Sequence, residues 1–174
     1  RVQCDNTLRI YSSENEKEGV ENYMILIGGE VVVKGVNQNG VCWRTGINLP
    51  EDDPDGIKNN YDEIVQLCKK GAIATSGNYR NFYIKDGKKY AHTIDPRTGY
   101  PAEQSVLSAT IVANDCMTAD AYATAFMAMG LEKARQMADS LPEIEYYVIY
   151  ADENGKHQIE YSKGMLQYLP KRKQ

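Results

Sequence analysis

Two segments of the sequence carry side chains that could do chemistry. The first, residues 92–101, reads His-Thr-Ile-Asp-Pro-Arg-Thr-Gly-Tyr-Pro and contains one of only two histidines. Histidine changes its charge near neutral pH and can act as a general base. Arginine can bind a phosphate or a carboxylate through two parallel hydrogen bonds. His92, Asp95, Arg97 and Thr98 are therefore candidate catalytic or binding residues.

Pro96 and Gly99 predict that this first segment forms a rigid turn. Proline fixes its own φ and holds Asp95 in an extended conformation, and Gly99 permits the tight turn that Thr98 enters. A rigid turn would hold reactive side chains in fixed positions, but it is also a common structural feature. Two interpretations stay open, a catalytic loop and a structural turn with a surface histidine.

The second segment, residues 118–124, reads Thr-Ala-Asp-Ala-Tyr-Ala-Thr. Asp120 and Thr124 are four residues apart and would share one face of a helix. The helix is otherwise small and apolar, so a buried Asp120 would need a partner for its charge. Mg²⁺ suits one carboxylate, one threonine hydroxyl and a substrate phosphate, because it commonly keeps few protein ligands. Asp120 and Thr124 are predicted metal ligands, and the alternative is an exposed aspartate on the rim of the helix.

Two glycine-containing segments each end an apolar run: Gly28-Gly29 and Thr75-Ser76-Gly77. Glycine at such a place lets the backbone approach a ligand closely or offer N–H groups to phosphate oxygens. Neither segment matches the glycine motifs of dinucleotide-binding folds or of nucleotide triphosphatases. By themselves these glycines are weak indications of a binding site.

The length of 174 residues predicts one domain over residues 1–174. The chain has a net charge of −4 and a pI near 5.3. The balance is acidic and the basic residues are scattered, so no nucleic-acid partner is expected. Four cysteines lie far apart without the spacing of a zinc site. We expect Cys42, Cys68 and Cys116 to be small core residues, which leaves the redox compartment open.

Hydrophobic periodicity predicts an α+β fold, with mixed or antiparallel sheets and a few packed helices. Strands are expected at residues 23–27, 30–34, 41–47, 61–68, 71–77, 82–84, 89–94, 106–113, 146–150 and 156–161. The second and third strands should form a hairpin through the turn at residues 37–40, and the last two through Asn154-Gly155. Helices are expected at residues 116–129, ended by Gly130, and at residues 132–141, ended by Pro142. Residues 1–17 are polar, and no element is predicted there.

Five segments together resemble a known family. They are Ile-Gly-Gly-Glu at 27–30, Trp-Arg-Thr-Gly-Ile at 43–47, Ala-Ile-Ala-Thr-Ser-Gly-Asn-Tyr at 72–79, the His-to-Pro segment at 92–101, and Asp-Ala-Tyr-Ala-Thr at 120–124. In order and spacing they are similar to the ApbE-like flavin transferases, many of which were labelled thiamine-biosynthesis lipoproteins. The resemblance covers residues 19–161 and implies an ApbE-like (T-fold-like) domain.

The resemblance implies a Mg²⁺-dependent enzyme that takes FAD as substrate. Such an enzyme transfers FMN to a threonine or serine of an acceptor flavoprotein in a membrane redox complex and releases AMP. Alternatives are an FAD pyrophosphatase that gives FMN and AMP, and a non-catalytic flavin-binding or assembly module. By the resemblance, His92 is catalytic and Asp120 and Thr124 hold the metal. The implied FAD-binding residues are Gly28, Gly29, Glu30, Thr75, Ser76, Gly77, Asp95, Arg97 and Thr98.

The sequence also departs from the family pattern. Family members are usually longer and carry an Ala-Lys-Gly motif on a helix ahead of the Gly-Gly-Glu segment, whereas residues 1–18 diverge from this pattern. We therefore expect residues 1–174 alone to bind FAD weakly, and the partner to be either a missing N-terminal half or a second copy in a homodimer. The family location is exported, periplasmic or lipid-anchored to a membrane, although residues 1–5 do not form a signal peptide.

Overall fold

The computed structural model describes residues 2–50, 60–77, 82–85, 88–91, 99 and 105–170. Its strands are β1 (Tyr23–Ile27), β2 (Glu30–Lys34), β3 (Trp43–Asn48), β4 (Tyr61–Leu67), β5 (Gly71–Gly77), β6 (Phe82–Lys85), β7 (Lys88–Ala91), β8 (Val106–Ala113), β9 (Glu145–Ala151) and β10 (His157–Tyr161). Its helices are α1 (Val2–Lys17), α2 (Cys116–Met129), α3 (Leu131–Ala138) and the 3₁₀ helix η1 (Lys163–Gln167).

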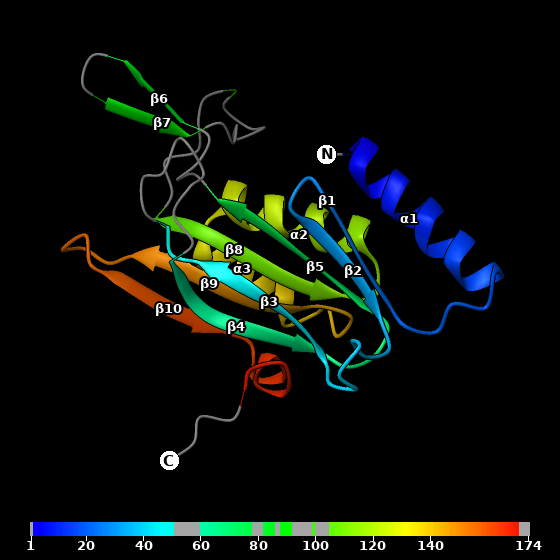
Figure 1. Ribbon diagram of the computed structural model, residues 1–174. Coiled ribbons are helices and arrows are strands. Elements are labelled where there is room, and N and C mark those ends of the chain that lie inside the picture. The colour runs from blue at the N-terminus through cyan, green and yellow to red at the C-terminus, as the bar shows by residue number, and fades with distance from the viewer. Residues whose placement is uncertain are drawn as a thin grey trace.

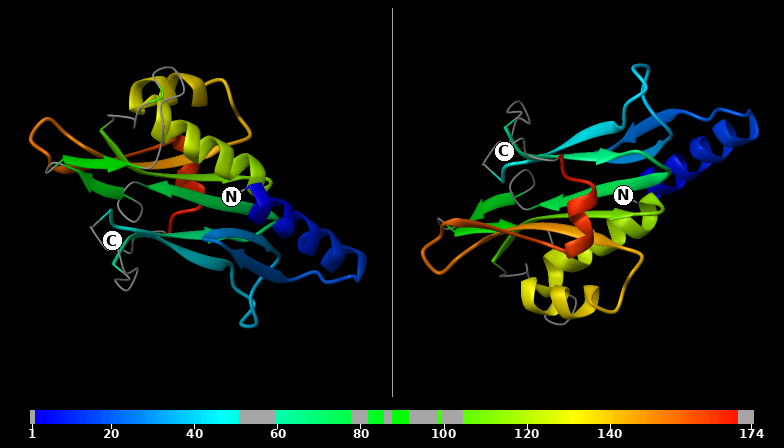
Figure 2. Two further views of the ribbon diagram at one scale, coloured as in Figure 1. Left: turned by 90° about the horizontal axis from the view of Figure 1, so that it is seen from above. Right: turned by 90° about the horizontal axis from the view of Figure 1, so that it is seen from below.

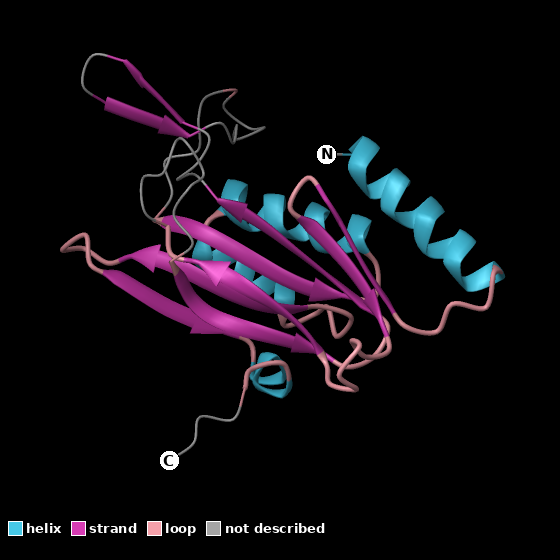
Figure 3. Cartoon of the chain, in the orientation of Figure 1, coloured by secondary structure: helices cyan, strands magenta, loops and turns pink. Residues whose placement is uncertain are grey.

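A six-stranded antiparallel sheet in the order β1-β2-β5-β8-β9-β10 forms the centre of the fold. Helices α2 and α3 cover one face of this sheet, and the separate hairpin β3–β4 covers the other (Figure 1, Figure 2). The hairpin β6–β7 forms a third, two-stranded sheet. The chain is therefore α+β with antiparallel sheets, as the hydrophobic periodicity predicts, and Figure 3 shows the helices and strands by type.

Strand alternation divides the core into two layers. Along β8, Ala109 and Ile111 pack with Phe126 of α2, whereas Val112 packs against Ile47 of β3 and other apolar residues on the hairpin side. Successive side chains of a strand point to opposite faces, so one strand supplies both layers. This two-sided burial explains why residues 106–113 form an almost continuous apolar run and why the strand was predicted with its bounds.

Glycines close the first hairpin. Gly28 and Gly29 have φ values of 68° and 103°, and Ile27 pairs with Glu30 across them. A two-residue turn with positive φ at both central positions matches the twist of the strands it joins, and glycine adopts this conformation without steric cost. The β1–β2 turn is therefore a structural reason for the glycine pair, independent of any role in ligand binding.

The predicted hairpin between residues 30–34 and 41–47 is wrong. Strand β3 pairs with β4, and only an isolated bridge between Val36 and Cys42 joins the segments around the turn. The reason is that β1 and β5 already occupy the two edges of β2. The chain therefore leaves the sheet after β2, and the Trp43 indole N–H donates to the Lys34 carbonyl at 3.0 Å where β3 begins.

Helix α1 was not predicted, because its buried stripe is narrow and mostly polar. Leu8 and Ser12 are its buried side chains among residues 6–17, and the Ser12 hydroxyl is 2.6 Å from the Tyr23 hydroxyl. The helix ends at a left-handed Gly19, with bonds from Val20 N to Asn15 O and from Gly19 N to Glu16 O. This is the Schellman arrangement, so Gly19 was the one local signal of a helix end.

Helix α3 is shorter than predicted. It ends at Ala138, and the Ser140 and Leu141 N–H groups continue the chain as turns that donate to Met137 and Ala138 before Pro142. By contrast, α2 has the predicted bounds, with Gly130 at its end with a φ of 80°. Pro142 lies in a further turn beyond the helix, in which the Ile144 N–H donates to the Leu141 carbonyl at 3.3 Å.

Cys42 and Cys68 form a disulfide bond, which corrects the expectation that they are separate core residues. Trp43 pairs with Leu67, so Cys42 and Cys68 stand opposite each other one position beyond the ladder of β3 and β4. The bond closes this end of the hairpin over a sequence separation of 26. Cys116 is buried as predicted and is not part of a disulfide bond.

Replacing both cysteines, in Cys42→Ala/Cys68→Ala, should lower the free energy of unfolding by about 2–4 kcal/mol, because a closed loop restricts the unfolded chain. Urea unfolding measured with and without a reductant provides the control. Reductant should destabilise the parent protein to the level of the double variant and leave the variant unchanged. Equal midpoints for the parent protein in both conditions would contradict the bond.

A hydrogen-bonded cluster of Arg135, Tyr146 and Glu160 connects α3 to β9 and β10. The Arg135 guanidinium donates to both oxygens of Glu160, at 2.8 and 2.5 Å, and the Tyr146 hydroxyl donates to Glu160 Oε1 at 3.2 Å. The adjacent guanidinium lowers the pKa of Glu160. Burial, together with the negative charge of Glu160, raises the pKa of Tyr146 to about 12 from its ordinary value of 10.0.

The raised pKa of Tyr146 predicts a loss of stability in alkali. A protonated Tyr146 favours the folded state, so its contribution is complete below pH 10.0 and is lost as the pH rises through about 12. Since the chain has 13 tyrosines, the tyrosinate absorbance of a Tyr146→Phe variant must be subtracted from that of the parent. The difference should titrate near pH 12, and Glu160→Gln should move it towards lower pH. A difference curve centred near pH 10 would contradict this assignment.

Candidate functional site

The candidate site lies where α2 crosses β5. The Ser76 hydroxyl of β5 is 3.2 Å from the Thr124 hydroxyl of α2, across 48 positions of sequence. Ser76 is only 2% exposed, whereas Thr124 lies on the exposed side of the contact. The two residues belong to different segments of the sequence, and the fold brings them into contact.

The start of α2 sets which of its side chains face the sheet. Asp115 caps the helix, and its carboxylate accepts hydrogen bonds from the backbone N–H and the hydroxyl of Thr118 at 2.9 and 2.8 Å. With the helix fixed in this way, Asp120 is 6% exposed and Thr124 follows one turn later. The burial of Asp120 excludes the alternative in which this carboxylate lies on the exposed rim of the helix.

Glu30 faces the same side of the sheet as α2. It lies two residues before Val32, which packs with Cys116 of α2, and it is 3% exposed. Val31 pairs with Ile73, so continuing the ladder by one residue places Glu30 opposite Ala74 and diagonal to Ser76. Two buried carboxylates, Glu30 and Asp120, therefore belong to the layer between the sheet and α2.

Thr75 faces the other side of the sheet. Its hydroxyl is 2.8 Å from the Thr110 hydroxyl of β8, and it alternates with Ser76 along β5. The side chain of Thr75 therefore cannot share a site with Thr124, although its backbone remains near. The predicted trio Thr75, Ser76 and Gly77 thus splits, and only Ser76 contributes a side chain to the α2 side.

The Gly28-Gly29 turn lies at the same end of the sheet as the end of β5. Because β2 and β5 are antiparallel, the residues that precede Glu30 stand level with those that follow Ala74. Both glycines are exposed, and a Cβ atom added to Gly29 would meet no atom within 4 Å. The backbone of this turn is therefore exposed, and its role in lining a nucleotide stays a prediction.

His92, Asp95, Arg97 and Thr98 lie outside the described residues, and their predicted roles stay predictions. They belong to the connection between β5, which ends at Gly77, and β8, which begins at Val106. The pairing of these two strands ends at Gly77 and Ser108. Gly99, in the same connection, has a φ of 74°, which agrees with the predicted turn.

The donor atoms that the described residues bring to the site are oxygens. Asp120 supplies a carboxylate, and Thr124 and Ser76 supply hydroxyls. In the part of the chain that the structure describes, no group of three His, Cys, Asp or Glu side chains could hold a metal ion. These oxygen donors fit a hard cation such as Mg²⁺, which needs few protein ligands.

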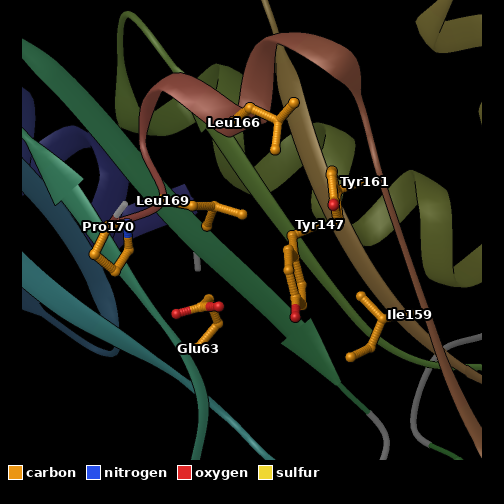
Figure 4. Close-up of a pocket in the computed structure, with 7 residues that line it drawn as sticks. All are labelled: Glu63, Tyr147, Ile159, Tyr161, Leu166, Leu169 and Pro170. Carbon is orange, nitrogen blue, oxygen red and sulfur yellow. The ribbon is translucent and has the colours of Figure 1, made fainter. Parts of the chain in front are cut away.

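A separate cavity of about 460 Å³ opens near the other side of the sheet, between β4, β9, β10 and η1. Figure 4 shows the residues that line it: Glu63, Tyr147, Ile159, Tyr161, Leu166, Leu169 and Pro170. The rings of Tyr147 and Tyr161 stack with centroids 5.8 Å apart, and the Tyr147 hydroxyl donates to Asp62 at 2.5 Å. No sequence pattern predicted this cavity. Its lining includes none of the predicted site residues.

No helix among the described residues is long and apolar enough to cross a membrane.

Comparison with known proteins gives a family. The family model described as "ApbE family" matches residues 11–148, and the chain belongs to the ApbE family. The match includes all the residues of the candidate site.

Relatives and solved structures agree with this assignment. A protein of Vibrio cholerae named "FAD:protein FMN transferase" is 44% identical over 125 residues, which are 72% of this chain and 36% of that protein. The protein of the same name from Escherichia coli K12 is 38% identical over 122 residues, 70% of this chain and 33% of that protein. Structures of the flavin transferase ApbE of V. cholerae and of the ApbE protein of Thermotoga maritima superpose with TM-scores of 0.80 and 0.75, at 36% and 30% identity. They match 95% and 97% of this chain and half of each of their own chains.

Proposed function

We propose that the protein containing this chain transfers the FMN part of FAD to a threonine or serine hydroxyl of an acceptor protein and releases AMP. The observation that carries the proposal is the oxygen cluster of Asp120, Thr124 and Ser76, with Asp120 buried beneath α2. Relatives whose name is "FAD:protein FMN transferase" match this chain over about a third of their length. The activity of the whole protein is thus a proposal for this chain.

The chemistry is a phosphoryl transfer. The acceptor hydroxyl oxygen forms a bond to the phosphorus of the FMN half, and the bond from that phosphorus to the bridging oxygen breaks, so that AMP leaves with this oxygen. Enzymes accelerate such reactions mainly by positioning the reacting groups and by neutralising the charge on the phosphate oxygens. A bound Mg²⁺ would supply that neutralisation and orient the pyrophosphate.

The residues of this chain have distinct roles in the proposal. Asp120 and Thr124 hold the ion through a carboxylate and a hydroxyl, and His92 accepts the proton of the acceptor hydroxyl. The backbone of the Gly28-Gly29 turn is exposed and lies beside the same end of β5, which supports its role in lining the nucleotide. The remaining residues proposed to bind FAD are Glu30, Ser76, Gly77, Asp95, Arg97 and Thr98, together with the backbone of Thr75, whose side chain faces the other side of the sheet.

Two other functions remain as alternatives. If water replaces the acceptor hydroxyl, the same site hydrolyses FAD to FMN and AMP. A non-catalytic flavin-binding or assembly module would keep the fold and produce no AMP. The products formed in one experiment separate all three.

The proposed location is outside the cytoplasm, periplasmic or lipid-anchored, with an acceptor that belongs to a membrane redox complex. The Cys42–Cys68 disulfide supports export, because such bonds persist in oxidising compartments. The proposed partner is either the N-terminal half of the family pattern or a second copy of this chain. Strand β10 lies at an edge of the sheet and exposes Ile159 and Tyr161, which supports pairing with a second copy.

The test is incubation of the whole natural protein with FAD, Mg²⁺ and a candidate acceptor, followed by mass spectrometry and AMP analysis. The parent protein should attach FMN to the acceptor. Asp120→Ala and Asp120→Asn should abolish this reaction, since each removes the charged ligand. Free FMN with AMP would favour the pyrophosphatase, and no AMP would favour the binding module. Full activity of Asp120→Asn with an unchanged requirement for Mg²⁺ would remove Asp120 from the metal site.

His92→Ala should lower the transfer rate about 10²- to 10⁴-fold, the usual range for loss of a general base. The residue is predicted to precede a turn, so the fold should remain. A thermal melt of the variant provides the control. Loss of folding would favour the structural interpretation of this turn over the catalytic one.

A further inference from the structure

We infer that Ser76 is a positioning residue for Thr124, whose hydroxyl it holds in the orientation that a cation needs. This inference rests on the proposed function, because it concerns the same metal site. The resemblance to the family groups Ser76 with residues that line the flavin nucleotide. The structure adds a different contact, the 3.2 Å hydrogen bond between the Ser76 and Thr124 hydroxyls.

A threonine on a helix has no fixed hydroxyl direction of its own. It divides between two side-chain rotamers, because its hydroxyl can bond to the carbonyl one turn earlier. Thr124 is an exposed residue of α2. A hydrogen bond to a fixed partner restricts the choice between its rotamers.

Ser76 is well placed to be this partner. It is 2% exposed, and β5 is paired with β8 through Gly77 and with β2 at its start. Its side chain thus comes from one of the most constrained strands of the fold. A hydrogen bond from this fixed position selects one rotamer of Thr124.

The hydrogen-bonding capacity of the two hydroxyls is compatible with a bound cation. Each hydroxyl donates one proton and accepts through two lone pairs. If Thr124 directs its proton at Ser76, this hydrogen bond uses neither lone pair of the Thr124 oxygen. If Ser76 donates instead, the hydrogen bond uses one of the two. Groups that orient a metal ligand in this way usually change metal affinity about 10- to 100-fold when they are removed.

The experiment measures Mn²⁺ binding to the whole natural protein by electron paramagnetic resonance, without turnover. Mn²⁺ is the probe because it prefers the same oxygen ligands as Mg²⁺. Ser76→Ala should weaken Mn²⁺ binding about 10- to 100-fold. In parallel, NMR of labelled threonine methyl groups should show one rotamer of Thr124 in the parent and averaging between rotamers in Ser76→Ala.

Thr110→Val is the matched control. It removes one hydroxyl from the pair Thr75–Thr110, which lies next to Ser76 in sequence but on the opposite face of the sheet. This variant should bind Mn²⁺ as the parent does and leave the rotamer of Thr124 unchanged. If it weakened Mn²⁺ binding as much as Ser76→Ala, the effect would be a general loss of stability, and the inference would be overturned.

Asp120→Asn separates the inference from the proposed function. If Asp120→Asn abolishes Mn²⁺ binding while Ser76→Ala binds as the parent, the proposed metal site stands and the role of Ser76 falls. If the parent binds no Mn²⁺, both fall. Weakened binding in Ser76→Ala without any change in the Thr124 rotamer would also overturn positioning, because Ser76 would then act on the ion by another route.

Discussion

The pairing of β5 with β8 beneath α2 is the constraint on which the rest of the structure depends. Both strands lie inside the sheet, and α2 covers one face of this pair while apolar residues of β3 and β4 pack on the other. Every side chain of β5 must therefore point either to the helix or to the hairpin. That choice decides that Ser76 contacts Thr124 and that Thr75 contacts Thr110.

The same layer carries the two buried carboxylates found among the described residues. Asp120 and Glu30 are almost completely buried between the sheet and α2, although an isolated buried carboxylate is costly. Stable soluble domains seldom place carboxylates in such layers without a reason, and binding of a cation and a phosphate ester is one that the neighbouring hydroxyls support. Stability and proposed function thus meet at one helix, whose small residues Ala119 and Ala123 allow it to pack closely on the strands.

The connections that precede and follow β5 differ in how the chain holds them. The connection between β2 and β5 forms the β3–β4 hairpin, packs on the sheet and is closed by the Cys42–Cys68 bond. The connection between β5 and β8 carries the segment with His92 and Arg97, and it joins Gly77 at the end of β5 to Val106 at the start of β8. The residues proposed for chemistry therefore lie on a connection whose ends are anchored next to Ser76. A rigid scaffold that carries functional residues on its connections is a common arrangement in enzymes.

The sequence by itself determined the positions of most strands, the bounds of α2, the family, and the common face of Asp120 and Thr124, because these depend on short-range periodicity and on local motifs. Only the tertiary structure decided that β3 pairs with β4, that Cys42 meets Cys68, that Asp120 is buried, and that Tyr147 and Tyr161 line a cavity. These features depend on which edges of β2 are already occupied and on contacts between residues far apart in the chain. Helix α1 is another feature that only the tertiary structure decided. It has few buried side chains, and Leu8 is buried because it packs with Tyr23 and Val32 of the sheet. Periodicity reports which side of an element is apolar, but it does not report which partner covers that side.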